Sequence, residues 1–461
     1  MPQPQIVWLR RDLRLADQAA FHAAARLGPV IPVYILDDET PAERRMGGAS
    51  RWYLHQALSA LEIELDHHEL RLILRRGRAD EVLGALVEET GAAGVHALRH
   101  YEPWWREAEE RLAGKVDLTL HDGLYLLPPG SVVTGGGTPF KIFTPFMRAL
   151  FAEIGEEEPL PVPDFSRPAK WPKSDRLEDL ALLPTAPDWA EGMRQAWTAG
   201  SAAAQERFDS FLEVIDDYRE DRELPSIDGS SRLSPQLHFG EVSPRQLWAQ
   251  VAHNPGRGAG FFRAELAWRD YAANLVAQFP RYTEEPYRPG YDHRLWRDPL
   301  TDEEAAADLK AWQQGRTGYP IVDAGMRQLW QTGWMHNRVR MIAASFLVKH
   351  LLIDWRHGEE WFWDTLVDAD HASNGTNWQW VSGTGVDSNM FVRIMAPLSQ
   401  SEKFDAGDYI RHYVPELASL ADPYVHDPEE AGCRPAAYPR KVIGHREARE
   451  RALAAYRAIS R

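Results

Sequence analysis

Hydrophobic positions in the first part of the chain follow two alternating patterns. Short apolar runs rich in Val, Ile and Leu predict buried strands, and the stretches between them carry apolar residues at helical spacing. Strands that alternate with helices in this way indicate βαβ units and a parallel sheet. The predicted strands are 6–10, 30–36, 71–76 and 94–99, and the predicted helices are 17–27, 50–65, 79–90 and 103–113.

The pattern weakens after about residue 125. Prolines cluster at 128–129, 159–163, 168–172 and 184–187. Such a stretch predicts a long connection over the surface, with one ordered piece at 139–151. We therefore expect an α/β domain at 1–125, an interdomain linker at 126–200 and a second domain at 201–461.

The second domain reads as all-helical. Ser243 and Pro244 form a helix start, with a capping residue followed by proline at the first helical position. The fold class expected is an N-terminal Rossmann-like α/β domain with a parallel sheet, joined to an all-α domain. No G-x-G-x-x-G follows the first strand and no phosphate-binding P-loop motif occurs, so the usual nucleotide fingerprints are missing. Apolar positions at helical period occupy 259–278, 321–332, 334–352 and 358–367.

Net charge changes the picture of possible partners. The chain carries −16 overall, which argues against a protein that coats nucleic acid non-specifically. Between Lys310 and Lys349, however, six basic residues accompany one acid, Asp323. A locally basic site on an acidic protein fits a discrete ligand that bears phosphate.

Cysteine content and hydropathy limit where in the cell the protein is expected. Cys433 is the single cysteine, which excludes disulfides within the chain and any cysteine-rich metal site. The N-terminus lacks a signal-peptide pattern, and no apolar run approaches the roughly 20 residues of a membrane span. We expect a cytoplasmic protein without a membrane partner, and no metal-ligand spacing stands out.

The stretch Trp361–Trp380 holds the most unusual combination of side chains. Asp368 and Asp370 are separated by one residue, Asn374 follows, and a turn-prone Gly-Thr-Asn precedes Trp378. Carboxylates beside large aromatics are costly to bury without partners. The stretch is either a loop over a core tryptophan cluster or one wall of a ligand site.

Three other groups of residues favour the ligand site. Glu265, Trp268 and Arg269 share one helix face, because they are spaced by three and four residues. Asn337, Arg340 and Met341 repeat this spacing, and the loop Ser230–Ser234 offers hydroxyls and an arginine that suit phosphate. A surface ion pair and a helix cap would explain single members. Together they indicate a large ligand with an aromatic part and phosphates.

At this point the motifs identify a family. WLRRDLRLADQAA, KIFTPF, DGSSRLSPQLHFGEVSPRQ, ELAWRDY, the long run from WQQGRTGYPIVDAGMRQLW through TGWMHNRVRMIAASFLVKHLLIDWR, and NWQW resemble the DNA photolyase/cryptochrome family of flavoproteins. The resemblance covers nearly the whole chain. It implies an α/β domain, a long linker and a helical domain that holds FAD.

The resemblance also implies site residues for the flavin. Asn374 matches the residue that faces flavin N5, and Asn at this position favours the repair branch of the family over plant cryptochromes. The implied FAD contacts are Tyr218, Ser230, Ser231, Arg232, Leu233, Ser234, Phe262, Glu265, Arg269, Asn337, Arg340, Asp368, Asp370 and Asn374.

The implied activity is light-driven repair of cyclobutane pyrimidine dimers in UV-damaged DNA, a carbon–carbon lyase reaction in which reduced FAD passes an electron to a flipped-out dimer. Met341 and Trp380 resemble enzymes for this lesion rather than for (6-4) products. The implied catalytic residues are Glu265, Trp268, Asn337, Met341 and Trp380, and the implied DNA contacts are Trp268, Asn337, Arg338, Trp380 and Arg393.

Two further features come from the resemblance alone. Trp378 and Trp355 match the inner residues of an electron relay, and the third member is Trp296, with Trp330 and Trp312 as alternatives. Members of the family bind a second, light-harvesting chromophore. We expect a folate rather than a deazaflavin, although Trp105 stands where some folate binders have an acid, with Glu102 and Trp104 nearby.

Three functions remain open on the sequence. The first is the repair enzyme, acting as a monomer without an obligate protein partner. The second is a blue-light photoreceptor of the cryptochrome type, which the lack of a long tail after the last helix disfavours. The third is a flavoprotein that binds undamaged DNA, against which the acidic balance argues.

Overall fold

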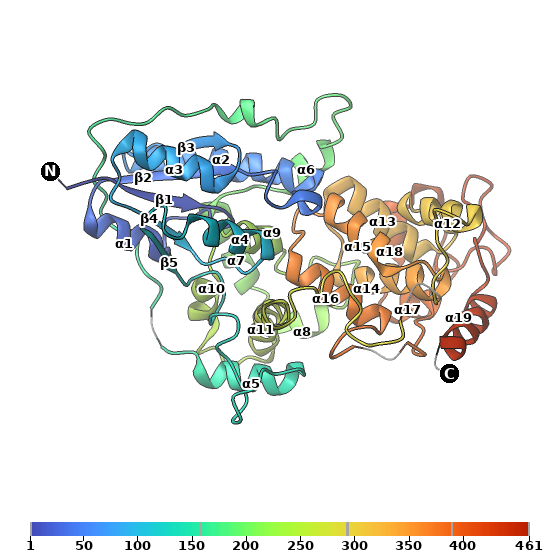
Figure 1. Ribbon diagram of the computed structural model, residues 1–461. Coiled ribbons are helices and arrows are strands. Elements are labelled where there is room, and N and C mark those ends of the chain that lie inside the picture. The colour runs from blue at the N-terminus through green and yellow to red at the C-terminus, as the bar shows by residue number, and fades with distance from the viewer. Residues whose placement is uncertain (1, 157, 292–294, 389–390, 460–461) are drawn as a thin grey trace. The chain divides into compact units, whose positions relative to one another are not determined.

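A five-stranded parallel sheet forms where the alternating pattern predicted one. The computed structural model describes residues 2–156, 158–291, 295–388 and 391–459. Its sheet has the strand order β3-β2-β1-β4-β5 (Figure 1), and Trp8 of the central strand pairs with Val33 on one side and Ala97 on the other. The strands are β1 (Gln5–Leu9), β2 (Val30–Leu36), β3 (Ile73–Arg76), β4 (Gly94–Leu98) and β5 (Leu118–His121).

The order of the strands explains their sequence patterns. β1, β2 and β4 are fully buried, as continuous apolar runs require. β5 was missed because it is a half-exposed edge strand with polar residues at alternate positions. The connecting helices fall close to the predicted ranges: α1 (Ala19–Leu27), α2 (Gly48–His67), α3 (Ala79–Thr90) and α4 (Pro103–Leu112).

The chain divides into two compact units. Unit 1 comprises residues 1–190, 196–216 and 231–280, and unit 2 comprises 191–195, 217–230 and 281–461. Unit 1 therefore contains the sheet and, in addition, several helices from beyond the proline-rich stretch. These are α5 (Phe143–Glu153), α7 (Ser201–Leu212), α9 (Ser234–Phe239), α10 (Pro244–Val251) and α11 (Arg257–Gln278).

Helix α10 starts where the sequence predicted. The Ser243 hydroxyl accepts from the backbone N–H of Gln246 at 2.9 Å, and the Gln246 side chain accepts from the backbone N–H of Ser243 at 2.8 Å. This reciprocal capping satisfies two backbone donors at the helix start.

Unit 2 is helical, which together with the sheet of unit 1 confirms the predicted fold class. Its helices are α6 (Glu191–Ala196), α8 (Tyr218–Asp221), α12 (Glu303–Gln313), α13 (Pro320–Thr332), α14 (Asn337–Ser345), α15 (Trp355–Thr365), α16 (His371–Ser382), α17 (Pro397–Lys403), α18 (Gly407–Tyr413) and α19 (His445–Ile459). The described residues also form 3₁₀ turns, among them η1 (Ala42–Arg44), η2 (Leu177–Leu180), η3 (Ile215–Asp217) and η6 (Pro415–Leu417).

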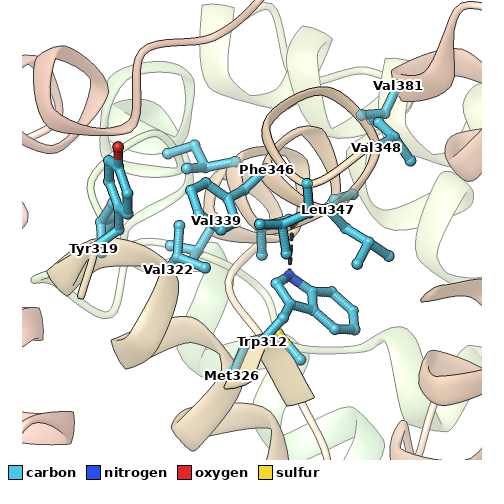
Figure 2. Close-up of a cluster of buried hydrophobic side chains, with 14 of the residues drawn as sticks. Trp312, Tyr319, Val322, Met326, Val339, Phe346, Leu347, Val348 and Val381 are labelled. Carbon is cyan, nitrogen blue, oxygen red and sulfur yellow. Dashed lines mark hydrogen bonds between the residues drawn. The ribbon is translucent and has the colours of Figure 1, made fainter. Parts of the chain in front are cut away.

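The core of unit 2 surrounds Trp312. Figure 2 shows its indole among side chains of α13 and α14, with the ring N–H donating to the backbone carbonyl of Ala343 at 3.0 Å. A buried tryptophan needs such a partner for its one donor. The hydrogen bond ties α12 to α14, and α14 carries several of the predicted site residues.

Two local predictions were wrong. The stretch 334–352 is not one α-helix: α14 begins at Asn337, because His336 caps it, and it continues as a π-helical segment, η5 (Phe346–His350). The Gly-Thr-Asn of the aspartate-rich stretch is not a turn, because it lies inside α16. Gly375 is needed there for close packing, since a Cβ would lie 2.6 Å from the Thr283 side chain.

Within the described part of the chain, no helix combines the length and the apolar character that crossing a membrane requires.

Candidate functional site

An arginine–aspartate pair connects α14 with the aspartate-rich stretch. Arg340 donates from Nη2 to Oδ2 of Asp368 at 2.9 Å and from Nε to the backbone carbonyl of Met335 at 2.7 Å. Asp368 is only 8% exposed. Two directional hydrogen bonds fix the guanidinium, so the pair forms a preorganised polar wall.

The other oxygen of Asp368 is available to a ligand. Within the described residues, Oδ1 is buried and has no hydrogen-bond partner. A buried acceptor in this state requires a donor. A ring N–H of a flavin would be a suitable donor, so the residues present fit the cofactor that the resemblance implies.

A second buried pair orients Asn374. Its side-chain N–H₂ group donates to the Glu359 carboxylate at 2.9 Å and to the Glu359 backbone carbonyl at 3.1 Å. Glu359 is 1% exposed and lies on α15. The two bonds fix the plane of the amide that we expect to face the flavin.

Sequence reasoning missed Glu359, although a signal was present. Glu359 lies four residues after Trp355 and three before Phe362, which places an acid on the apolar face of its helix. An acid in that position is costly unless it has a partner. The partner could not be found from the sequence, because Asn374 lies on the next helix.

The second acid of the Asp-x-Asp pair caps the helix that follows it. Asp370 is the N-cap of α16, and its carboxylate accepts from the backbone N–H of Ser373 at 2.8 Å. Its negative charge lies at the positive end of the helix, where it is stabilised.

A cavity in unit 2 collects four of the predicted lesion and DNA residues. Its volume is about 660 Å³, and it is lined by apolar, aromatic and basic side chains. The lining residues are Glu223, Arg338, Met341, Trp380, Arg393, Ile394, Met395, Ala396, Gln400, Lys403 and Phe404. The cations suit an anionic ligand at the rim, and the flat apolar groups suit a base.

Arg338 is held against the wall of this cavity. It forms an ion pair with Glu223, its guanidinium lies 4.5 Å above the Phe404 ring, and Nη1 lies 3.7 Å from the sulfur of Met341. Asn337, one residue earlier, is exposed at the start of α14.

The predicted residues of α11 lie in unit 1. Glu265 and Trp268 are half-buried there, and Trp268 stacks on Phe143 with ring centroids 3.5 Å apart. Arg269 donates to the backbone carbonyl of Leu124 at 2.5 Å, and its guanidinium lies 4.4 Å above the Tyr125 ring. Phe262 packs in the core of unit 1, with its ring 5.1 Å from that of Phe211.

The predicted phosphate loop precedes α9, as expected. Arg232 has a left-handed backbone with φ of 50°, which marks a tight turn directly before the helix start at Ser234. Tyr218 is buried at the start of α8. Ser231 to Ser234 belong to unit 1, and Tyr218 and Ser230 belong to unit 2.

Comparisons with known proteins decide which family this arrangement represents. Residues 5–164 match the family model described as DNA photolyase, and residues 262–458 match the FAD binding domain of DNA photolyase. The chain belongs to the DNA photolyase/cryptochrome family. The predicted family is confirmed, and the helical region contains an FAD-binding domain.

Individual relatives are similar to this chain over nearly its whole length. A deoxyribodipyrimidine photo-lyase of Agrobacterium fabrum is 44% identical over 99% of this chain and 98% of its own. Cryptochrome-2 of Arabidopsis thaliana is 34% identical over 94% of this chain and 73% of its own. The crystal structure of a bacterial class III photolyase from Agrobacterium tumefaciens superimposes with a TM-score of 0.92 at 43% identity, covering 100% of this chain and 98% of that one.

Within this photolyase-family chain, the two inner residues of the predicted relay are buried in unit 2. Trp355 and Trp378 are 0% and 2% exposed. Trp378 lies directly against Gly358, because a Cβ there would be 2.1 Å from the indole. The helix that carries Trp355 therefore contacts the ring of Trp378.

The candidates for the third relay position differ in their surroundings. Trp296 is 9% exposed, and the next residue, Arg297, donates its backbone N–H to the carbonyl of Leu352 at 2.7 Å. Trp312 is buried 6.2 Å from Trp378, and Trp330 is 58% exposed and stacks on Trp361.

The acid near the predicted antenna position is already engaged. Glu102 is 5% exposed, forms an ion pair with Arg11 and accepts from the backbone N–H of Tyr101 at 3.2 Å. Trp105 packs edge-on against Trp8 at 6.0 Å. Glu102 is thus already paired within the protein.

Proposed function

We propose that this protein is a deoxyribodipyrimidine photo-lyase that splits cyclobutane pyrimidine dimers in UV-damaged DNA under blue light. The observation that carries the proposal is the cavity of unit 2, in which Met341 and Trp380 lie beside Arg338 and Arg393. The identity of 44% over 99% of the chain to a curated photo-lyase supports the same activity.

The substrate chemistry matches the composition of the cavity. A dimer inside a duplex must leave the base stack to reach a protein pocket, which costs a few kcal/mol and less for damaged DNA. The ring of Trp380 and the side chain of Met341 offer flat apolar surface for the flipped bases. Arg338 and Arg393 offer charge to the adjacent phosphates.

The bound FAD, in its reduced form, would supply the electron that splits the dimer. The proposed cofactor contacts in unit 2 include Arg340, Asp368, Asp370 and Asn374. The proposed cofactor contacts in unit 1 include Arg269 and the hydroxyls of Ser231 and Ser234. Tyr218, Ser230, Arg232, Leu233, Phe262, Glu265 and Asn337 complete the proposed contacts. Glu359 would keep the Asn374 amide in one orientation.

Glu265 and Trp268 are the proposed dimer contacts on α11, with Asn337 as a contact from α14. The proposed relay that restores the reduced flavin consists of Trp378, Trp355 and Trp296.

We further propose that the protein acts as a monomer in the cytoplasm. A reducing compartment fits a chain with a single cysteine. A folate antenna remains our prediction, and extraction of the bound chromophores with their absorption spectra would test it.

The second candidate is a photoreceptor without repair activity. It is favoured by the identity of 34% to Cryptochrome-2, a protein of which this chain covers 73%. The two candidates share a flavin and differ in what happens to damaged DNA.

A light-dependent repair assay separates the candidates. Purified protein is photoreduced and mixed with an oligonucleotide that carries one thymine dimer, with and without blue light, after its absorption spectrum is recorded. Restored thymines in the light alone support the repair enzyme. A flavin spectrum without repair supports the photoreceptor, and Glu265→Ala and Trp268→Ala variants that repair normally would contradict the assigned site.

A further inference from the structure

The two rings of Phe143 and Trp268 form a nearly parallel stack in unit 1. Their centroids are 3.5 Å apart and their planes differ by 7°. Phe143 is the first residue of α5, and Trp268 lies in the middle of α11. These two helices pack against each other (Figure 1).

A third aromatic residue holds the stack in place. The Tyr271 hydroxyl donates to the backbone carbonyl of Lys141 at 2.8 Å, and the Tyr271 ring packs edge-on against Phe143 at 5.7 Å and Trp268 at 5.5 Å. Tyr271 therefore fixes both the backbone before Phe143 and the edges of the two stacked rings. The segment concerned is KIFTPF, a motif to which no role in the site has been assigned so far.

The docking of α5 does not depend on Phe143 alone. Phe146 and Leu150 are 1% and 0% exposed, and Phe146 contacts Tyr271 with a centroid distance of 5.4 Å. Phe143 is 9% exposed and lies on a half-buried tryptophan. Its contribution is directed at Trp268 more than at the anchoring of its own helix.

One face of the Trp268 indole is thus occupied by protein. A partly exposed tryptophan without such support would sample several rotamers and would lose that freedom when a base stacked on it. With Phe143 in place, that cost is met during folding, and the indole is held in one orientation.

We propose that Phe143 is a positioning residue for damaged DNA: it covers one face of Trp268 and fixes the indole plane, so that the other face receives the flipped dimer. The proposal rests on the proposed function, because it takes Trp268 as a residue that contacts the dimer. The chemical class recognised is a pair of flat, unstacked pyrimidines.

The test uses four single variants of the full-length holoprotein, together with Trp268→Leu and its combination with Phe143→Leu. Phe143→Leu removes the ring, Phe143→Met fills the space without a ring, and Phe143→Tyr keeps the ring. Phe140→Leu is the matched control, because Phe140 lies in the same segment and contacts Phe146 at 6.3 Å. The Kd for a dimer-containing and an undamaged oligonucleotide is measured, together with repair at saturating DNA and the Tm.

We expect Phe143→Leu and Phe143→Met to raise the Kd for dimer-containing DNA roughly three- to tenfold, with little change for undamaged DNA. Phe143→Tyr should retain most of the discrimination, and Phe140→Leu should match the wild type. Repair at saturating DNA should fall by a smaller factor than the affinity for dimer-containing DNA. In a Trp268→Leu background, Phe143→Leu should have almost no further effect on the Kd.

Several results would overturn the proposal. One is a Phe143→Met protein with wild-type discrimination, which shows that bulk suffices. Another is full additivity of the effects of Phe143→Leu and Trp268→Leu. If Phe143→Leu does not fold, Phe143→Met and Phe143→Tyr still decide the question. Absence of repair by the wild-type protein would instead count against the proposed function.

Discussion

Lys349 donates from Nζ to the backbone carbonyl of Arg393 at 2.9 Å. Lys349 is 1% exposed and lies in the π-helical segment η5, and π-helical turns are frequent near functional sites. The residues Arg393–Ala396 line the cavity of unit 2. The buried ammonium group of Lys349 thus fixes the backbone of Arg393 in the wall of the proposed dimer site.

Replacing this lysine should affect binding more than stability. Lys349→Met removes the donor to the cavity wall, but it also removes a buried charge, and the two effects on the free energy of unfolding offset each other to within about 1–2 kcal/mol at pH 7. We expect the Kd for dimer-containing DNA to rise roughly fivefold. Lys310→Met, at an exposed position of α12, is the control and should leave both quantities unchanged.

Stability should also depend on pH through this residue. Burial, with a contribution from the charge of Arg393, lowers the pKa of Lys349 to about 8 from its usual 10.5. Between these two values the unfolded chain binds more protons than the native protein, so the stability of the wild type rises with pH. Urea unfolding at pH 7 to 10 should show the wild type gaining about 1–3 kcal/mol relative to Lys349→Met. An unchanged difference between the two proteins across this range would contradict the prediction.

The carboxylate of Asp368 should be needed for the flavin. Asp368→Asn weakens the bond from Arg340 and places an N–H₂ group where an acceptor is required, so we expect the ratio of FAD to protein to fall severalfold after gel filtration. The absorption at flavin and protein wavelengths measures this ratio. Glu360→Gln, an exposed acid on α15, is the control. Full FAD content in Asp368→Asn protein would exclude the assigned contact.

The ion pair of Glu223 with Arg338 should restrain binding of ordinary DNA. Glu223→Gln removes the one acid among the described residues that line the cavity, and we expect the affinity for undamaged oligonucleotide to rise roughly three- to tenfold at low salt. Raising the salt concentration should remove most of the gain. Glu220→Gln makes the same charge change on an exposed residue of α8 and should have a smaller effect. Equal effects of the two substitutions would show that net charge alone is responsible.

Close packing at Gly358 should be required for the proposed electron relay. A Cβ at this position would lie 2.1 Å from Trp378, so Gly358→Ala must displace the indole at a cost of about 1–3 kcal/mol in stability. We expect slower light-driven reduction of the flavin, measured by absorption, while chemically reduced protein still repairs dimers. Gly444→Ala adds the same methyl group into open space and should behave as wild type. Normal photoreduction in Gly358→Ala protein would argue against Trp378 as a relay member.

Periodicity alone determined most elements of this protein. Continuous apolar runs located the buried strands, because a strand covered on both faces has no polar side to interrupt the run. The capping signals of Ser243 and Pro244 located the start of α10. The edge strand β5 was not predicted, since an edge strand is half-polar. Gly375 was predicted to lie in a turn, because a glycine is compatible with both a turn and a crowded helix.

The sequence also predicted which polar side chains of one helix lie together, because their spacing places them on a common face. Partners from different segments were decided only by the tertiary structure. The amide of Asn374 on Glu359, Lys349 on the carbonyl of Arg393, and Phe143 on Trp268 each join segments that a sequence pattern treats separately. Local periodicity reports which side of an element is buried, whereas the identity of the neighbour depends on how the elements pack.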